Sequence, residues 1–349
     1  MISFFTSFFI VYLLTPLTIC LAKKFKLITD PKKRYHPAHT HKGIIPRGGG
    51  IPIYLSLLLS SLIFLQPNKI IIGILISSFM MLLLGLLDDY KDTSPILRFF
   101  ANIAIATFLV FFGLGVPYIS NPFGGVIHLD NLKIKVFFFG ERDFLVFANL
   151  FSIIWLVWVT NMVNWSKGVD GQLPGFVAIT AFFLGVLSMR FVAHDISINN
   201  VVNLAFIVSG AYLGFLPYNF YPQKIMPGYS GGALAGFLLG ILSILSFGKL
   251  GTAILILAIP LTDALYTIIR RLKNKKSIFK ADWGHFHHRL LEIGWGKRRI
   301  ALFYWLVSLF LGVVSLFLKG KEKLIAFITI GLLLIIFMII IEKTKKIKI

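Results

Sequence analysis

The sequence predicts an all-α polytopic membrane protein with about eleven transmembrane helices and a short extracytoplasmic β-hairpin, organised as a single domain over residues 1–349. Composition is the first observation behind this prediction. The chain is 57% hydrophobic and 15% aromatic, with a mean hydropathy of +0.85. The second is that apolar runs recur along the whole chain, and no segment between them is long enough for a soluble domain.

The apolar runs give the expected helices in order. They cover residues 2–21, 51–65, 69–87, 96–116, 144–163, 173–192, 201–217, 231–247, 251–269, 300–318 and 323–341. Most are near the roughly 20 residues that a helix needs to cross the hydrocarbon core, and the run 51–65 is short. The first run has no basic residue before its apolar core and no small-residue cleavage site. We therefore expect a retained helix and not a signal peptide.

The β-hairpin is expected between the runs 96–116 and 144–163. The segment Asn121 to Gly125 reads NPFGG, which is a turn signal. The residues that follow, VIHLDNLKIKVF, partly alternate between apolar and polar side chains. Alternation next to a turn is typical of a hairpin.

The formal net charge of +21 raises nucleic acid as a partner, but the distribution of the charge argues against it. With the N-terminus placed outside, 26 of the 35 Lys and Arg residues fall on the cytoplasmic side and 9 on the other. This bias follows the positive-inside rule. It predicts a multi-pass protein of the inner (cytoplasmic) membrane, with the basic tail from Lys343 to Lys348 against anionic lipids and no nucleic-acid partner.

An acidic cluster follows the run 69–87. The chain has only 14 acidic residues, yet Asp88, Asp89 and Asp92 lie within five positions. Adjacent carboxylates at a membrane edge suit a metal ion, a phosphate reaction or a proton relay. The alternative is an interfacial cap of a transmembrane helix.

Two further segments on the same side carry polar motifs. In PRGGG, three glycines after Arg47 let the backbone approach an anion, and Lys42 and Arg47 add charge, although a basic run is also typical of solvated surface. In NMVNWSKGVDGQLPG, from Asn161 to Gly175, two asparagines share a helical face before a glycine turn. That turn suits recognition of a base, and the alternative is an ordinary helix C-cap.

The last large loop contains the motif HFHHR, with His285, His287, His288 and Arg289. Clustered imidazoles could bind zinc, but no thiolate accompanies them and the neighbourhood is strongly cationic. A cradle for phosphates fits that charge better, since histidine donates hydrogen bonds and moves protons near neutral pH. A solvated basic loop is the remaining interpretation.

Taken together and in this order, the motifs resemble those of the polyprenyl-phosphate N-acetylhexosamine-1-phosphate transferase family, also called glycosyltransferase family 4. The resemblance extends from His41 to Gly294 and rests on HKGIIPRGGG, LDDYKD, NMVNWSKGVDG, LPYNFYP, the P-x-x-D of Pro260 to Asp263, and HFHHR. The HxHHR pattern is more similar to the branch that uses UDP-N-acetylglucosamine. It implies transfer of N-acetylglucosamine-1-phosphate, or a related N-acetylhexosamine-1-phosphate, from a UDP-sugar to undecaprenyl or another polyprenyl phosphate. UMP leaves in this first membrane step of cell-envelope glycan synthesis.

The resemblance also implies the site residues. Asp88 and Asp89 would be catalytic, and Asn164 and Asp89 would bind Mg²⁺, with Mn²⁺ as the alternative ion. The implied substrate-binding residues are Lys42, Arg47, Asn161, Gly168, Val169, Asp170, Asn219, His285, His287, His288 and Arg289.

Two positions depart from the family pattern. The pattern N-x-x-N-x-x-D-G-x-D-G has an aspartate where this chain has Lys167. A second family aspartate, a principal Mg²⁺ ligand, aligns with Tyr229. Losing a carboxylate while gaining the ammonium of Lys167 makes the local charge more positive by about 2, which would weaken a divalent cation site or partly substitute for it.

Alternatives to this assignment remain open at the level of sequence. They are a phospho-MurNAc-pentapeptide transferase, another UDP-linked sugar as donor, and a non-catalytic relative that binds lipid or nucleotide. A transporter is a further alternative, although the charged residues lie at helix ends and not at mid-helix. Relatives can dimerise, so a homodimer is also open.

Overall fold

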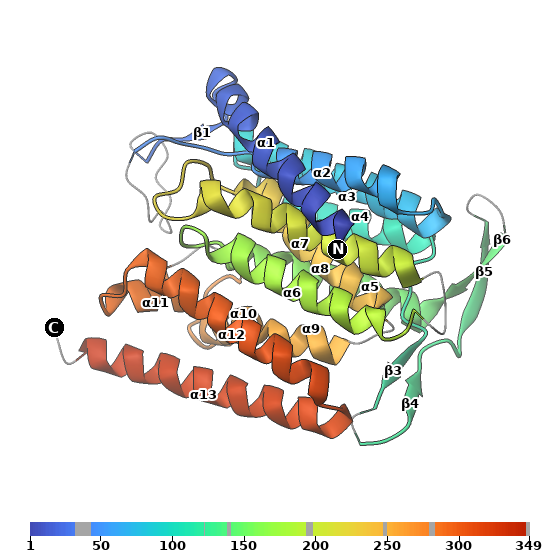
Figure 1. The fold of residues 1–349 in the computed structure, drawn as a ribbon. Coiled ribbons are helices and arrows are strands. Elements are labelled where there is room, and N and C mark those ends of the chain that lie inside the picture. Colours follow the sequence, from blue (N-terminus) through green and yellow to red (C-terminus); the bar gives the residue numbers. More distant parts are fainter. Residues whose placement is uncertain are drawn as a thin grey trace.

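The computed structural model describes residues 1–31, 43–121, 123–137, 141–192, 198–246, 250–278 and 283–346. Most of these residues are helical (Figure 1). The helices are α1 (Ile2–Lys24), α2 (Gly50–Phe64), α3 (Lys69–Lys91), α4 (Pro95–Phe111), α5 (Val146–Trp165), α6 (Gln172–Met189), α7 (Ile198–Asn219), α8 (Gly228–Leu245), α9 (Leu250–Ile256), α10 (Ala258–Lys273), α11 (Phe286–Glu292), α12 (Lys297–Phe317) and α13 (Gly320–Lys346).

The helices confirm a multi-pass, all-α membrane architecture. Eight of those in the described ranges are long and apolar enough to cross a membrane, and α9 with α10 makes a ninth if the bent pair is one span. Helices α2 and α4 are apolar but shorter. Every predicted apolar run overlaps at least one of these helices. The number of actual crossings stays a prediction.

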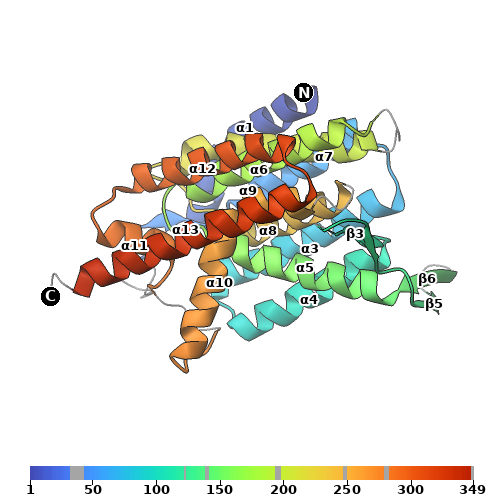
Figure 2. The same cartoon turned by 90° about the horizontal axis from the view of Figure 1, so that it is seen from below.

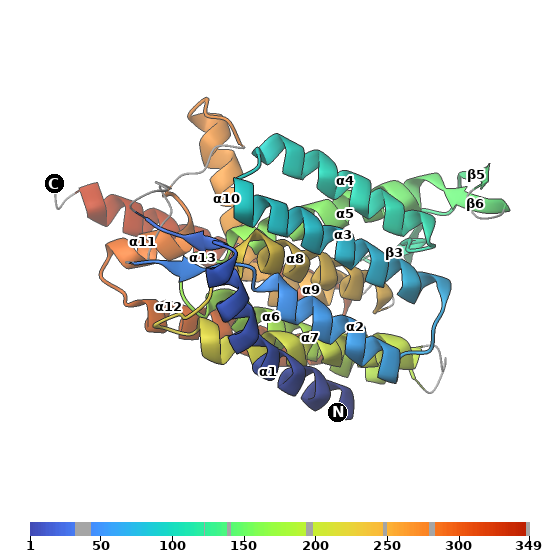
Figure 3. The same cartoon turned by 90° about the horizontal axis from the view of Figure 1, so that it is seen from above.

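The run 251–269 differs from its prediction because it is broken into α9 and α10, which meet at 80°. Figures 2 and 3 show α10 leaving the common direction of the bundle. Pro260, in the first turn of α10, has no N–H to donate to the carbonyl of Ile256. That carbonyl instead accepts a hydrogen bond from Oγ of Ser308 on α12, at 3.4 Å.

The predicted hairpin is present and a second one follows it. Strands β3 (Tyr118–Ser120) and β4 (Val126–His128) pair in antiparallel fashion across the predicted turn, and β5 (Lys133–Phe137) pairs with β6 (Glu141–Leu145). Both hairpins lie at one end of the bundle, whereas α11 lies at the other (Figure 1). A two-stranded ribbon of β1 (Ile28–Thr29) and β2 (Ile45–Pro46) also lies at the end with α11.

Helix α8 is the centre of the core. All its residues from Gly228 to Ile244 are buried, and it packs against α3 and α5. A side chain at Gly236 would collide with the backbone of Thr160 on α5, so glycine permits this close approach. The packing brings the beginning of α8 against the ends of α3 and α5, where the polar motifs lie.

Candidate active site

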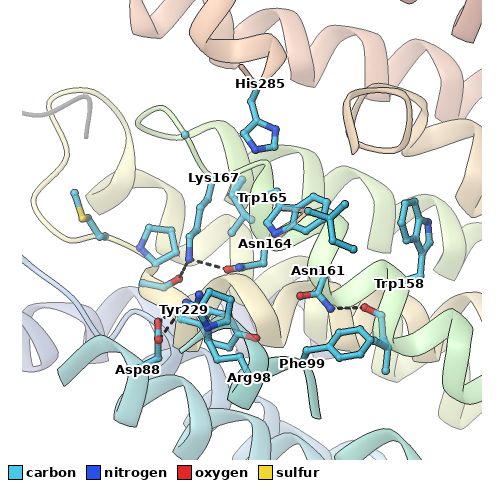
Figure 4. Close-up of a pocket in the computed structure, with 18 of the residues that line it drawn as sticks. Asp88, Arg98, Phe99, Trp158, Asn161, Asn164, Trp165, Lys167, Tyr229 and His285 are labelled. Atoms are coloured by element: carbon cyan, nitrogen blue, oxygen red, sulfur yellow. Dashed lines mark hydrogen bonds and ion pairs between the residues drawn. The ribbon is translucent and has the colours of Figure 1, made fainter. Parts of the chain in front are cut away.

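A cavity of ≈ 700 Å³ lies where the ends of α3, α5 and α10 meet the beginnings of α4 and α8, with α11 beside them. Several predicted site residues far apart in the sequence come together there. Those that line it are Arg47, Asp88, Asn161, Asn164, Gly168, Val169, Asn219, His285, His287 and His288. Figure 4 shows His285 on the opposite side of the cavity from Asp88 and Arg98.

Asp88 is held at the cavity wall by Arg98, an arginine that none of the sequence motifs includes. Nη1 of Arg98 lies 3.1 Å from both carboxylate oxygens of Asp88, and Oγ1 of Thr93 donates to Oδ1 at 2.7 Å. The geometry follows from a tight connection: α3 ends at Lys91, and Ser94 caps α4 by accepting from the N–H of Leu97. Arg98 thereby lies over the end of α3.

Asp89 has a different environment and does not line the cavity. Its Oδ1 accepts from the N–H of Tyr229 at 2.7 Å, and its Oδ2 accepts from the N–H and Oγ of Ser230 at 3.2 and 2.7 Å. A carboxylate in this position stabilises the positive end of the α8 dipole. Gly228, at φ +68°, is needed because a side chain there would collide with the Asp89 carboxylate.

Lys167 extends into the centre of the cavity wall. Its Nζ donates to Oδ1 of Asn164 at 2.7 Å and to the carbonyl of Gly228 at 2.9 Å (Figure 4). Burial lowers the pKa of this ammonium to about 8, while the charges of Asp89 and Asp88 oppose the shift. Asn164 therefore faces a cation that belongs to the chain itself.

Tyr229 separates two of the site cations. Its hydroxyl accepts from Nδ2 of Asn102 at 3.0 Å. The ring centroid lies 5.0 Å from the guanidinium carbon of Arg98 and 5.5 Å from Nζ of Lys167. The electron-rich face of a tyrosine ring stabilises cations at such distances.

Arg47 joins this group from the ribbon that precedes α2. Its Nε donates to Oγ1 of Thr29 on β1, and its Nη1 lies 3.9 Å from an oxygen of Asp89 and 3.9 Å from an oxygen of Asp92. Thus Arg47, Arg98 and Lys167 all line the cavity near Asp88. The arrangement makes this end of the cavity attractive to phosphate.

The histidine motif is anchored by Asp263 on α10. Nδ1 of His285 lies 3.0 Å from Oδ2 of Asp263, and the N–H of Phe286 donates to Oδ1 at 2.8 Å. Asp263 had appeared in the sequence only as part of the P-x-x-D motif, with no role assigned. The contact fixes the beginning of α11 and the orientation of the His285 ring.

His287 and His288 continue from that anchor. The His287 ring is parallel to that of His285, with centroids 5.7 Å apart, and it lies against Gly168, where a side chain would collide with it. Burial, followed by the charges of His288 and His285, lowers the pKa of His287 well below 6.5. His288 stacks on Trp283 at 4.0 Å. The structure therefore favours a neutral His287 beside the glycine turn.

Three predicted residues connect loops and helices near the site. Asn219 accepts from the N–H of Gly171 at 3.1 Å, and it lines the cavity as well. Asp170 pairs with Lys297 at 2.9 Å, and Arg289 pairs with Glu342 on α13 at 2.9 Å; neither lines the cavity. Lys42, predicted to contact the nucleotide, lies outside the described residues.

One side of the cavity is apolar. The residues there come from α4 and α5 and were missed as site residues because they read simply as parts of apolar runs: Phe99, Ile103, Leu150, Ile153, Ile154, Val157 and Trp158. Figure 4 shows Phe99 and Trp158 together on one side of Asn161, away from Lys167. The cavity thus joins a cationic end to an apolar side.

The predicted metal ligands can be compared with this geometry. Mg²⁺ prefers about six oxygen donors in an octahedral arrangement. Oδ1 of Asn164 accepts from the Lys167 ammonium, and both oxygens of Asp89 accept hydrogen bonds from the beginning of α8. Across the described ranges no group of three or more His, Cys, Asp or Glu residues could hold a metal ion. As arranged, these donors do not fit a divalent cation, and Mg²⁺ or Mn²⁺ stays a prediction of the resemblance alone.

Comparison with known proteins places this geometry in context. Residues 71–247 match the model of the family described as glycosyl transferase family 4. The chain is 29% identical to the probable undecaprenyl-phosphate N-acetylglucosaminyl 1-phosphate transferase of Bacillus subtilis, over 98% of this chain and 91% of that protein. It is 30% identical to the undecaprenyl-phosphate alpha-N-acetylglucosaminyl 1-phosphate transferase of Thermotoga maritima, over 79% and 77%. It is also 28% identical to the phospho-N-acetylmuramoyl-pentapeptide-transferase of Orientia tsutsugamushi, over 90% and 91%.

Proposed function

Because the chain belongs to glycosyl transferase family 4, we propose that it transfers N-acetylglucosamine-1-phosphate from UDP-N-acetylglucosamine to undecaprenyl phosphate or a related polyprenyl phosphate, releasing UMP. The names of the relatives from Bacillus subtilis and Thermotoga maritima support this donor and acceptor. The reaction would begin the assembly of a cell-envelope glycan on its lipid carrier.

The observation that carries the proposal is the cavity with a cationic end and an apolar side. A polyprenyl phosphate has the same division, since its phosphate is charged and its chain is hydrocarbon. Arg47, Arg98 and Lys167 offer charge to phosphates, while Phe99 and Trp158 offer surface to an isoprenoid chain. A wholly polar donor and a mostly apolar acceptor can therefore meet in one cavity.

The proposed chemistry follows from this arrangement. An oxygen of the lipid phosphate attacks the β-phosphorus of the UDP-sugar, and the bond from that phosphorus to the bridging oxygen breaks. The electron pair leaves with UMP. Phosphoryl transfer depends mainly on positioning and on neutralising charge at the phosphate oxygens, which is the role of the cations.

Within this reaction Asp88 would accept the proton of a singly ionised lipid phosphate. Its pairing with Arg98 orients the carboxylate at the cavity wall. His285 and the neutral His287 would hydrogen-bond the donor from the opposite side, beside the turn at Gly168 and Val169 that is proposed to hold uracil. Asp89 would act by fixing the beginning of α8.

The proposed orientation places the cavity at the cytoplasmic face of the inner membrane and the N-terminus outside. The excess of Lys and Arg on that side supports it. The β3–β4 and β5–β6 hairpins would then be extracytoplasmic, since they lie at the other end of the bundle (Figure 1). We propose about eleven crossings if the short helices α2 and α4 and the bent pair each count as one.

A non-catalytic relative is the second candidate, favoured by the engagement of Asn164 and Asp89 within the chain. Such a protein would bind the donor or the lipid without releasing UMP. The relative from Orientia tsutsugamushi adds UDP-MurNAc-pentapeptide as an alternative donor.

The deciding experiment measures UMP release by detergent-purified protein given UDP-N-acetylglucosamine and undecaprenyl phosphate. We expect release that requires the lipid and is greater with this donor than with UDP-MurNAc-pentapeptide. Asp88→Asn serves as the matched inactive control. Donor binding without release under every condition would identify the non-catalytic relative instead.

A further inference from the structure

The ammonium of Lys167 is a positive charge at the wall of the cavity that the protein itself supplies. Lys167 lines the cavity, and two of the three N–H bonds of its ammonium point to neutral oxygens, those of Asn164 and the Gly228 carbonyl. Both contacts orient the ammonium without neutralising it. A third N–H bond remains for a ligand in the cavity.

We propose that Lys167 takes the place of a divalent cation in this site, and that its ammonium neutralises the pyrophosphate of the UDP-sugar during transfer. The inference rests on the proposed function and concerns the same site. It assigns Lys167 as a catalytic residue and predicts a transfer reaction that needs no added metal.

The oxygen donors of the site support this assignment. A hard divalent cation would have to displace the ammonium from Asn164 and would lie close to a second positive charge. Asp89 is already committed to the N–H groups of Tyr229 and Ser230. Asp88 is paired with Arg98, so a metal ion on this carboxylate would also lie close to that guanidinium. Each displacement would cost existing charge-assisted hydrogen bonds, which are about twice as strong as neutral ones.

The side chain at position 229 supports the same role. Tyr229 presents a neutral ring to Lys167 at 5.5 Å, and its hydroxyl is oriented by Asn102. A carboxylate there would pair with the ammonium and consume its charge, whereas the ring stabilises the cation and leaves the charge to act on a phosphate. The same ring also lies against the guanidinium of Arg98, which donates a hydrogen bond to Asp88. Lys167 and Tyr229 therefore form one coherent arrangement.

The charges also balance without a metal. Among the charged residues that line the cavity, four bring a positive charge (Arg47, Arg98, Lys167 and Arg271) and two bring a negative charge (Asp88 and Asp92). The donor pyrophosphate carries about two negative charges near neutral pH, so the cations compensate it. Low dielectric in a partly apolar cavity strengthens each of these interactions.

The test compares UMP release in EDTA and in Mg²⁺ by the wild type, Lys167→Met and Lys224→Met. Lys224 is the matched control, since it is exposed on a neighbouring loop and does not line the cavity. We expect the wild type and Lys224→Met to keep their rate in EDTA. Lys167→Met should lose about 10²- to 10³-fold in kcat, the usual effect of removing one donor to a developing charge.

Metal binding gives a second measurement that does not depend on turnover. Titration with Mn²⁺, followed by electron paramagnetic resonance, should show no bound ion in the wild type. The double variant Lys167→Asp with Tyr229→Asp adds two carboxylates beside Asn164, an oxygen set that a hard cation prefers. This variant should bind Mn²⁺ if it melts at a temperature near that of the wild type.

The outcomes separate the two proposals. Lipid-dependent release that is abolished by EDTA and restored by Mg²⁺ would overturn the role of Lys167 and leave the transferase intact. Full activity of Lys167→Met in EDTA would also overturn it. If no donor supports UMP release, the proposed transferase activity is wrong. In that case, binding of Mn²⁺ by the wild type would still contradict, on its own, the proposal that Lys167 replaces a divalent cation.

Discussion

Asp88 and Asp89 are neighbours in the sequence but bind different parts of the molecule. Asp88 lines the cavity and pairs with Arg98 at 3.1 Å, whereas Asp89 accepts three hydrogen bonds from the beginning of α8. One carboxylate is thus available to a substrate and the other stabilises a helix junction. Asp88 and Asp89 therefore have two separate roles.

Substitution of each aspartate by asparagine should separate these roles. We expect Asp88→Asn to lose about 10²- to 10⁴-fold in UMP release while its melting temperature stays close to that of the wild type, because general acid–base groups contribute on that order. Asp89→Asn should lower stability by about 2–3 kcal/mol, since hydrogen bonds to a charged acceptor are among the strong ones. Thermal melting and initial rates measured on both variants would check this. Equal losses of stability would contradict the division.

Asp263 gives a second prediction, on the position of the histidine motif. Asp263→Asn should weaken the contacts to His285 and to the N–H of Phe286, and α11 should lose its fixed start. We expect the KM for the UDP-sugar to rise about tenfold or more, with a smaller change in the KM for the lipid, because the motif faces the donor side. His128→Asn, on an exposed hairpin, is the control and should change neither value. An equal rise in both constants would indicate general unfolding instead.

The sequence allowed prediction of the helical architecture because hydrophobic length is a local property. Every apolar run became a helix or, at 251–269, a bent pair. It also allowed selection of residues that meet in the cavity, such as Arg47 and Asn164, since they lie in polar motifs next to the ends of apolar runs. What the sequence could not give was the pairing between side chains. Arg98 counted only as one more basic residue, and its contact with Asp88 depends on how α4 folds back over α3.

The same limit applies to Lys167. In the sequence it was a departure that weakened the expectation of a metal, and its meaning depended on what lay around it. In the structure the Lys167 ammonium donates a hydrogen bond to Asn164 and lies beside the ring of Tyr229, which belongs to a different segment of the chain. Tertiary contacts therefore turn two unrelated departures into one local arrangement.

Phe99 gives a prediction about the lipid. Phe99 lines the apolar side of the cavity, whereas its neighbour Phe100 is 62% exposed on the outer face of α4. Phe99→Ala should raise the KM for undecaprenyl phosphate about tenfold or more and affect a short-chain prenyl phosphate less, because burial of a Phe side chain contributes about 1.5–3 kcal/mol. Phe100→Ala is the matched control. If both variants respond alike to chain length, the acceptor does not occupy this side of the cavity.

The pH dependence of stability tests the environment of His287. Burial and the neighbouring His288 and His285 hold its pKa well below 6.5 in the folded protein, whereas an unfolded histidine has a pKa of about 6.5. As the pH falls below about 6.5, the unfolded chain therefore binds a proton that the folded chain excludes, and stability decreases by up to about 1.4 kcal/mol per pH unit.

We expect the melting temperature of the wild type to fall between pH 7.5 and 5.5 by more than that of His287→Gln. The glutamine cannot be protonated, so this contribution is absent at every pH, whatever the substitution does to stability at pH 7.5. His128→Gln removes a histidine from an exposed strand end and controls for the same change of side chain away from the site. A slope for His287→Gln equal to that of the wild type would mean that His287 accepts its proton in the folded site, which would contradict a neutral ring beside Gly168.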